Sequence, residues 1–176
     1  MRATLSHMWD KSAQYLRKMG GLILVASLFV WFLSYFPRPV AGEPEIEHYE
    51  NSYLGQLGRW CEPAVEPLGL NWKAGVAILS GVSAKEIVVS TLGVLYSQDA
   101  TADDASLAQT LRESGDFTPA SALAFLVFVL LYFPCIATIV AVRNEAGRGW
   151  ALASMVYSTA VAWFVAWIVY HIALLL

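Results

Sequence analysis

The stretch that decides the fold is residues 72–96, WKAGVAILSGVSAKEIVVSTLGVLY. It is long enough to cross a bilayer as a helix, for which about 20 apolar residues suffice. Lys85 and Glu86 nevertheless stand side by side within it, and a charge at bilayer depth costs roughly 2.5 to 3.5 kcal/mol on insertion scales. Such residues persist where they face a protein interior or an aqueous pathway. With Gly81 just before them, they predict two half-helices that meet at a functional break.

The composition as a whole is that of an integral membrane protein. Of the 176 residues, 57% are hydrophobic and 14% are charged, and the mean hydropathy is +0.53. Soluble domains have an apolar share of about 45 to 50%. The net charge is −3 and the basic residues form no long run, so nucleic acid is not an expected partner. Cys61 lies in a polar connection and Cys135 in an apolar segment, so no disulfide is expected.

Hydropathy divides the chain into a surface helix followed by an all-α, polytopic membrane domain with interrupted or re-entrant helices. Residues 1–19 predict an amphipathic helix at the cytoplasmic surface and not a cleavable signal. Residues 20–176 predict the membrane domain, in this order: a span at 20–36, an extracytoplasmic loop at 37–71, the interrupted segment at 72–96, a polar loop at 97–119, a second interrupted segment at 120–142 and a span at 150–176.

The connections also carry local signals. The loop at 37–71 holds a short apolar stripe, from Tyr53 to Cys61, after which Pro63 and Pro67 are expected to break the helix. The polar loop at 97–119 predicts a short surface helix around Leu107 and Leu111. Thr118 followed by proline is a typical helix start.

The basic residues predict an orientation that constrains the interrupted segments. Four of them precede the first span and place the N-terminus in the cytoplasm: Arg2, Lys11, Arg17 and Lys18. Arg143 and Arg148 suggest the same side for the last tight connection. Either one interrupted segment is therefore re-entrant, which we favour, or the signal of these two arginines is misleading, and the sequence leaves open which segment it would be.

The first interrupted segment offers oxygen ligands for a cation. On a helix, Ser83, Glu86 and Ser90 would share one face, which gives a carboxylate flanked by hydroxyls. The ammonium group of Lys85 would point elsewhere and could bond carbonyls exposed at another helix break. A polar contact that only fixes helix packing is the open alternative.

The second interrupted segment adds a sulfur ligand. Pro134 is expected to free carbonyls around Leu130 and Leu131, and Cys135 follows it directly, three residues before Thr138. Sulfur suits a borderline metal such as ferrous iron better than magnesium or calcium. The alternative is that Cys135 is a small buried hydrophobe.

A function of another class also stays open. Ser83 as nucleophile and His171 as base would make an intramembrane serine hydrolase, although Lys85 and Glu86 have no role in that mechanism. The phosphate-binding pattern GxxxxGK[ST] does not occur, so this chain is not expected to be an enzyme that hydrolyses a nucleotide.

Several blocks in order resemble the C-terminal membrane region of the bacterial ferrous iron transport protein B (FeoB) family. They are YLRKMG (15–20), ENSYLG (50–55), EP (62–63), PLG (67–69), WK (72–73), AKE (84–86), STLGVLY (90–96) and FPCIAT (133–138). The resemblance implies a multi-pass permease of the inner membrane that imports Fe2+, built from two related gate halves of which this chain is the second. It also implies, as partners, an N-terminal GTP-binding domain, the first gate half and a small cytoplasmic accessory protein, besides membrane lipid.

By the same resemblance, the Ala84-Lys85-Glu86 and Phe133-Pro134-Cys135 blocks belong to the ion pathway, with Cys135 as the leading iron contact. Spacing and chemistry add Glu86, with Ser83, Ser90 and Thr138 as lesser contacts, while Lys85, Pro134 and Gly81 are expected to have structural or gating roles. Fe2+ is then the transported substrate, and no GTP site is expected here. Another solute, a nucleoside or a different divalent metal, stays open, as does a homo-oligomeric state.

Overall fold

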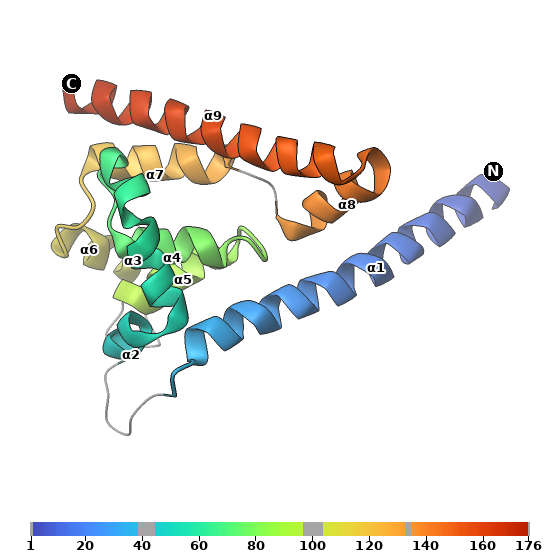
Figure 1. The fold of residues 1–176 in the computed structure, drawn as a ribbon, viewed down its shortest axis with the longest axis horizontal. Helices are drawn as coiled ribbons and strands as arrows, with labels where there is room; N and C mark the ends of the chain where they lie inside the picture. The colour runs from blue at the N-terminus through green and yellow to red at the C-terminus, as the bar shows by residue number, and fades with distance from the viewer. Residues whose placement is uncertain (1, 39–44, 97–103, 133–134, 176) are drawn as a thin grey trace.

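The computed structural model describes residues 2–38, 45–96, 104–132 and 135–175, and every regular element in these ranges is helical. The elements are α1 (Arg2–Tyr35), α2 (Glu45–Asn51), α3 (Tyr53–Val65), the 3₁₀ helix η1 (Glu66–Leu68), α4 (Trp72–Ser80), α5 (Ile87–Tyr96), α6 (Asp104–Glu113), α7 (Pro119–Leu131), α8 (Ile136–Ala146) and α9 (Arg148–Leu175) (Figure 1). The predicted all-α class is confirmed.

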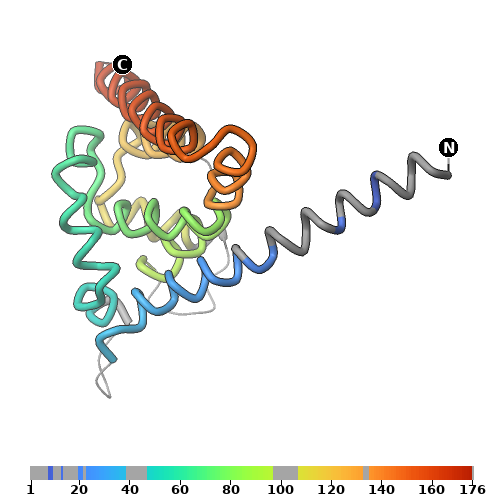
Figure 2. The backbone as a smooth tube through the Cα atoms, turned by 45° about the vertical axis from the view of Figure 1, so that its right-hand side comes forward, coloured from blue at the N-terminus to red at the C-terminus, as the bar shows by residue number. Residues whose placement is uncertain are grey.

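Helix α1 is continuous, so the predicted surface helix runs into the predicted first span without a break. Figure 1 shows it as one long arm, and its main contacts are with α3 and α8; Figure 2 shows its C-terminal part beside the other helices from a second side. There the amide of Tyr53 donates to the carbonyl of Phe36 at 3.0 Å, which ties the end of α1 to the start of α3. Val30 and Leu33 also pack on the core of the neighbouring helices. The boundary at residue 19 and the other domain limits stay predictions.

The connection after α1 holds more structure than a loop. Helix α3 begins at the side chain of Ser52, which accepts from the amide of Gly55 at 3.1 Å. It continues through Pro63 and ends at Val65, so the helix ends between the two prolines that were expected to break it, and Pro63 alone does not do so. Proline lacks one backbone donor and crowds the preceding turn, and the helix carries on for only two residues beyond it. The predicted surface helix around Leu107 and Leu111 is present as α6.

The segment at 72–96 is interrupted, as predicted, and it folds back on itself. Helix α4 ends at Ser80, α5 starts at Ile87, and the six residues between them form turns. The Nδ2 of Asn71, which caps α4, donates to the hydroxyl of Tyr96 at the end of α5 at 3.2 Å. The start of α4 and the end of α5 therefore lie together. The link at 81–86 lies at the other end of this hairpin (Figure 1).

The segment at 120–142 is also interrupted. Thr118 and Ser121 form a reciprocal capping box at the start of α7, as the Thr-Pro sequence predicts. Helix α7 ends at Leu131, where Tyr132 turns to an extended conformation with ψ of 167°, and α8 begins after Cys135. Pro134 lies outside the described residues, so its predicted part in this break is untested. Helix α8 is offset from the axis of α7 (Figure 1).

Two groups of buried residues hold the helices together. One joins η1, α7 and α9, and the indole of Trp163 on α9 donates to the carbonyl of Ala64 at 2.7 Å. The other joins α3, α4 and α5. At their crossing, α3 and α4 approach closely at Gly58, where a Cβ would lie 3.0 Å from the carbonyl oxygen of Trp72.

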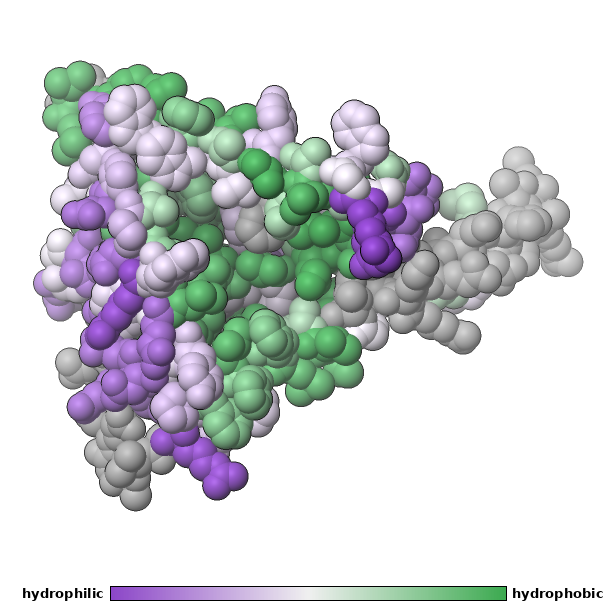
Figure 3. Space-filling view, in the orientation of Figure 1, coloured by the Kyte–Doolittle hydropathy of each residue, from purple (hydrophilic) through white to green (hydrophobic). Residues whose placement is uncertain are grey.

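Much of the outer surface is apolar, as in a membrane domain. Among the described residues, two stretches are long and apolar enough to cross a bilayer: Pro119–Ala146, which includes the break after α7, and Arg148–Leu175. Large side chains such as Phe29, Trp31 and Phe164 are exposed. Figure 3 shows hydrophilic residues gathered over α2 and α3 at one end and over the α8–α9 turn at the other, with hydrophobic surface between them.

Candidate functional site

The link at 81–86 meets the break between α7 and α8, and this meeting point is the candidate site. The amide of Ile136, at the start of α8, donates to the carbonyl of Val82 in the link at 3.1 Å. The side chain of Lys85 reaches from the same link to the end of α7. The two interrupted segments are thus joined at their breaks, and we call this place the junction.

Lys85 makes the main contact of the junction. Its Nζ donates to the carbonyls of Val129 at 3.1 Å, Leu130 at 3.3 Å and Tyr132 at 3.4 Å, and it lies 4.7 Å from the centre of the Tyr132 ring. The last carbonyls of a helix have no amide partner within it, and an ammonium group has three donors to offer. The contact expected between Lys85 and carbonyls at another helix break is therefore present.

Gly81 lets the link approach α7. A Cβ at this position would lie 2.5 Å from the hydroxyl oxygen of Tyr132 and closer still to a methyl group of Val88. Any larger residue would push the link away from the end of α7, and so away from the carbonyls that Lys85 binds. The position fits the structural role predicted for it.

The predicted face of Ser83, Glu86 and Ser90 does not form. It requires an unbroken helix, whereas Ser83 lies in the non-helical link. Ser83 is buried and its Oγ donates to the carbonyl of Ser80 at 3.0 Å, while Glu86 and Ser90 are exposed. A helical period does not hold across a break, because the break changes the direction of every side chain after it.

Cys135 lies on the other side of the junction, at the N-terminal cap of α8. It is half-buried, and its Sγ lies 3.7 Å from the hydroxyl of Thr138, three residues along as the sequence places it. Glu86 lies on the other segment, at the end of the link, and its side chain is exposed. The junction thus joins a segment that carries a thiol beside a hydroxyl to a segment that carries an exposed carboxylate.

The carboxylate of Glu86 is not neutralised by the adjacent Lys85. No ion pair joins Lys85 and Glu86 within the part of the chain that the structure describes. In the same ranges, no three His, Cys, Asp or Glu side chains come together as a metal cage. Glu86 and Cys135 are therefore a pair of candidate ligands, and a complete coordination sphere needs carbonyls, hydroxyls, water or groups from another chain segment.

The geometry contradicts the serine hydrolase alternative. The hydroxyl of Ser83 is bonded to Ser80, and Nδ1 of His171 lies 2.9 Å from the carbonyl of Trp167 on its own helix. His171 sits near the C-terminal end of α9, beside Tyr170, whose ring packs on Gly69 at the base of the hairpin. The link that holds Ser83 is at the opposite end of the hairpin (Figure 1). A nucleophile and its base must lie within hydrogen-bond reach, and these two do not.

A polar cluster at the base of the hairpin is not predicted by the sequence. The carboxylate of Asp116 accepts from the hydroxyl of Tyr96 at 3.0 Å and pairs with Nζ of Lys73 at 3.4 Å. Asn71 completes the cluster through its bond to Tyr96. The one signal for it is that polar residues flank both ends of the 72–96 segment, as expected if the two ends meet.

These features define the class of the protein: a helical membrane domain built around two discontinuous segments that meet at their breaks, an arrangement that many transporters use. The chain belongs to the Gate family, described as "Nucleoside recognition", whose match covers residues 16–149.

Similar proteins identify the kind of gate. The chain is 41% identical to the "Fe(2+) transport protein A/Fe(2+) transporter FeoB fusion protein" of Porphyromonas gingivalis over 99% of its own length and 25% of that protein. It is 37% identical to the "Fe(2+) transporter FeoB" of Campylobacter jejuni over 96% of the chain and 28% of that protein. It is 34% identical to the "Fe(2+) transporter FeoB" of Methanocaldococcus jannaschii over 96% of the chain and 25% of that protein. No solved structure matches the chain.

The chain is therefore a Gate domain of the FeoB type, and the resemblance drawn from its motifs is confirmed. It spans about a quarter of the length of these relatives.

Proposed function

We propose that this chain forms the C-terminal permease part of a ferrous iron transporter and that Fe2+ passes through the junction. The observation that carries the proposal is the set of bonds from Lys85 to the carbonyls at the end of α7, because they hold the two breaks together. Glu86 and Cys135 are each next to a residue that makes these contacts between the two segments: Glu86 follows Lys85, and Cys135 precedes Ile136. Discontinuous helices that meet in this way expose backbone oxygens to an ion at the middle of the membrane.

The proposed ligands are Cys135, Glu86 and the hydroxyl of Thr138. Ser90 remains a lesser candidate for a step along the path, and Ser83 contributes only through the lone pairs of its buried hydroxyl. A pathway needs ligands weak and multiple enough that the ion leaves again. Sites in internally repeated transporters lie at the interface of the repeats, so the first gate half would complete the coordination sphere.

Lys85 acts as the gate of this pathway. Its ammonium group occupies carbonyl oxygens that a passing cation would otherwise use, so an ion in the pathway and Lys85 compete for the same ligands. Displacement of Lys85 would both free the carbonyls and loosen the link from α7. In the complete transporter, a cytoplasmic GTP-binding domain would control this step, with a small accessory protein as a further partner.

The α4–α5 hairpin is the re-entrant element. Its base is closed by the bond between Asn71 and Tyr96, so the segment enters and leaves on one side of the membrane. The Arg143 and Arg148 turn then lies on the same side as the N-terminus, which removes the conflict in the basic-residue count. We place both in the cytoplasm and the end of α9 on the outer side of the bacterial inner membrane.

Uptake of Fe2+, Mn2+ and Zn2+ by cells that carry the complete transporter tests the function. Cys135→Ser and Glu86→Gln should each lower Fe2+ uptake at least tenfold at equal levels of inserted protein. Cys61→Ser on α3 and Glu113→Gln on α6 remove the same groups away from the junction and should leave uptake unchanged. Normal iron uptake by both junction variants would overturn the assignment.

The same assay separates a second candidate substrate. The family description, "Nucleoside recognition", raises a nucleoside as the transported solute. A carboxylate and a thiol suit a borderline metal, whereas the ring of Tyr132 at the junction is already covered by the ammonium group of Lys85. We therefore expect excess nucleoside not to compete with Fe2+; competition at matched concentrations would favour the nucleoside.

A further inference from the structure

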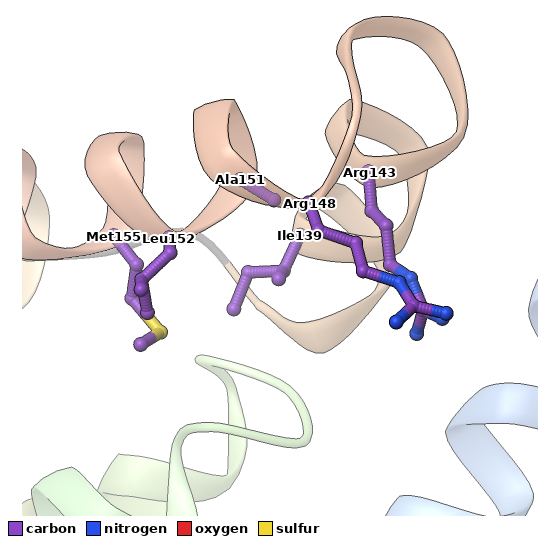
Figure 4. Close-up of a pocket in the computed structure, with 6 residues that line it drawn as sticks. All are labelled: Ile139, Arg143, Arg148, Ala151, Leu152 and Met155. Atoms are coloured by element: carbon purple, nitrogen blue, oxygen red, sulfur yellow. The ribbon is translucent and has the colours of Figure 1, made fainter.

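The α8–α9 turn carries a pocket that the iron pathway does not use. The pocket has a volume of about 360 Å³ and is lined by Ile139, Arg143, Arg148, Ala151, Leu152 and Met155. Figure 4 shows the two arginine side chains, one from α8 and one from the first residue of α9, reaching the same place with their guanidinium groups. The remaining side chains form an apolar wall beside them.

The two guanidinium groups concentrate positive charge at this turn, and Glu145, the carboxylate between them in the sequence, forms no ion pair with either within the ranges that the structure describes. Neither Arg143 nor Arg148 takes part in an ion pair in the described part of the chain, where the ion pairs are those of Arg59 and Lys73. Helix α9 begins at Arg148, and its free amides add the positive end of a helix dipole. The two positive charges repel each other. An anion bound between them would be attracted to both and would offset this repulsion. Guanidinium groups bind phosphate oxygens through two parallel hydrogen bonds.

The apolar side chains of the pocket indicate which kind of anion would fit it. Ile139, Leu152 and Met155 lie along the pocket, and the side chain of Leu152 is exposed. In Figure 3 the hydrophilic patch over this turn borders hydrophobic surface. A free phosphate would use only the arginines and leave this wall bare. A molecule with a phosphate at one end and a hydrocarbon chain at the other uses both.

We propose that this pocket binds an anionic phospholipid, with its phosphate between Arg143 and Arg148 and an acyl chain along Ile139, Leu152 and Met155. The inference rests on the membrane placement given above and not on the identity of the transported ion. Basic pockets between membrane helices on the cytoplasmic side bind anionic headgroups, and each Lys or Arg contributes about fivefold in affinity for such a surface. The lipid would brace the α8–α9 turn and so the position of Cys135 at the start of α8.

Native mass spectrometry of the purified protein in detergent, titrated with phosphatidylglycerol or phosphatidylcholine, tests the proposal. Arg143→Gln with Arg148→Gln should weaken phosphatidylglycerol binding roughly 25-fold, the product of two losses of about fivefold. Phosphatidylcholine should bind weakly and equally to both proteins. Arg112→Gln removes the same charge from α6, in another part of the fold, and should change nothing. Unchanged phosphatidylglycerol binding by the double variant would overturn the proposal.

A second arm distinguishes the lipid from a soluble phosphate. Leu152→Ala with Met155→Ala should weaken binding of the diacyl lipid and leave the binding of glycerol phosphate unchanged. If this variant binds the lipid as tightly as the parent, the apolar wall has no part in binding and the site is one for free phosphate. Iron uptake is not the readout here, so failure of this proposal and failure of the iron pathway give different results.

Discussion

At each end of the α4–α5 hairpin a lysine lies over a tyrosine ring, but the two lysines differ in the groups that balance their charge. At the base, Lys73 lies 4.5 Å from the ring of Tyr96 and forms an ion pair with Asp116. At the tip, Lys85 lies 4.7 Å from the ring of Tyr132, but its charge is met by carbonyl dipoles and not by a carboxylate. The base is closed by neutralised charges. At the tip, Glu86 forms no ion pair with Lys85. Its carboxylate is therefore available to a cation.

Removal of the two lysines should give the largest difference between the ends. Lys85→Met leaves three carbonyls without their donor, and hydrogen bonds to charged groups contribute about 1.5 to 3 kcal/mol each, so a loss of several kcal/mol is expected. Lys73→Met breaks a pair whose side chains are 21% and 34% exposed, which should cost about 1 kcal/mol or less. Thermal unfolding of the purified protein in detergent measures both. Equal losses would mean that the tip is not special.

The glycines of the hairpin sharpen the same comparison. Gly81→Ala forces a Cβ against Tyr132 and Val88, and overpacking of this kind costs about 1 to 3 kcal/mol. Gly93→Ala, in the middle of α5 where nothing lies within 4 Å, should instead stabilise the protein by about 0.5 to 1 kcal/mol. The same unfolding assay should therefore give shifts of opposite sign. A stabilising Gly81→Ala would contradict the close approach of the link to α7.

The base should respond mildly to the loss of one hydroxyl. Tyr96→Phe removes the bonds to Asn71 and Asp116 but keeps the ring under Lys73, so a loss of about 1 kcal/mol is expected. Iron uptake should stay within about twofold of normal, because the base is not part of the pathway. A loss of uptake as large as that of Glu86→Gln would place the pathway at the base instead.

The last prediction concerns the side of the membrane from which Cys61 can be labelled, and how its labelling rate depends on pH. Helix α3 lies at the base end, so an impermeant maleimide added to intact spheroplasts should label Cys61 from outside. Burial raises the pKa of this thiol, so its thiolate fraction, and with it the labelling rate, should keep rising at pH values where an exposed cysteine already reacts quickly. Labelling of Cys61 only in inverted vesicles would reverse the proposed orientation.

How far the sequence could lead differs between these same two ends. The break at the link was predictable, because the charges of Lys85 and Glu86 disfavour an unbroken apolar span. The break after α7 was expected from Pro134, whose part in it stays a prediction. The bond of Lys85 to carbonyls followed from the donors of an ammonium group and the free carbonyls at a helix end. The prediction that Ser83 and Glu86 share one helix face was wrong, because a helical period does not extend across a break.

The base cluster could not be foreseen in the same way. Asn71 and Tyr96 lie at opposite ends of a segment that a hydropathy profile treats as one crossing, and only the reversal of direction at the link brings them together. The charge count pointed to one re-entrant segment but not to which one. That choice depends on tertiary contacts such as the approach of Gly81 to Tyr132, which sequence spacing does not encode.

The most direct test of the junction uses a metal as a bridge. Glu86→Cys would place a second thiol opposite Cys135, and two thiols from the two segments should bind Cd2+ tightly. We predict that micromolar Cd2+ blocks Fe2+ uptake in this variant, that a chelator restores it, and that adding Cys135→Ser abolishes the block. Uptake by Glu86→Cys that is as insensitive to Cd2+ as uptake by the Glu86→Cys, Cys135→Ser double variant would contradict a metal pathway between the two breaks.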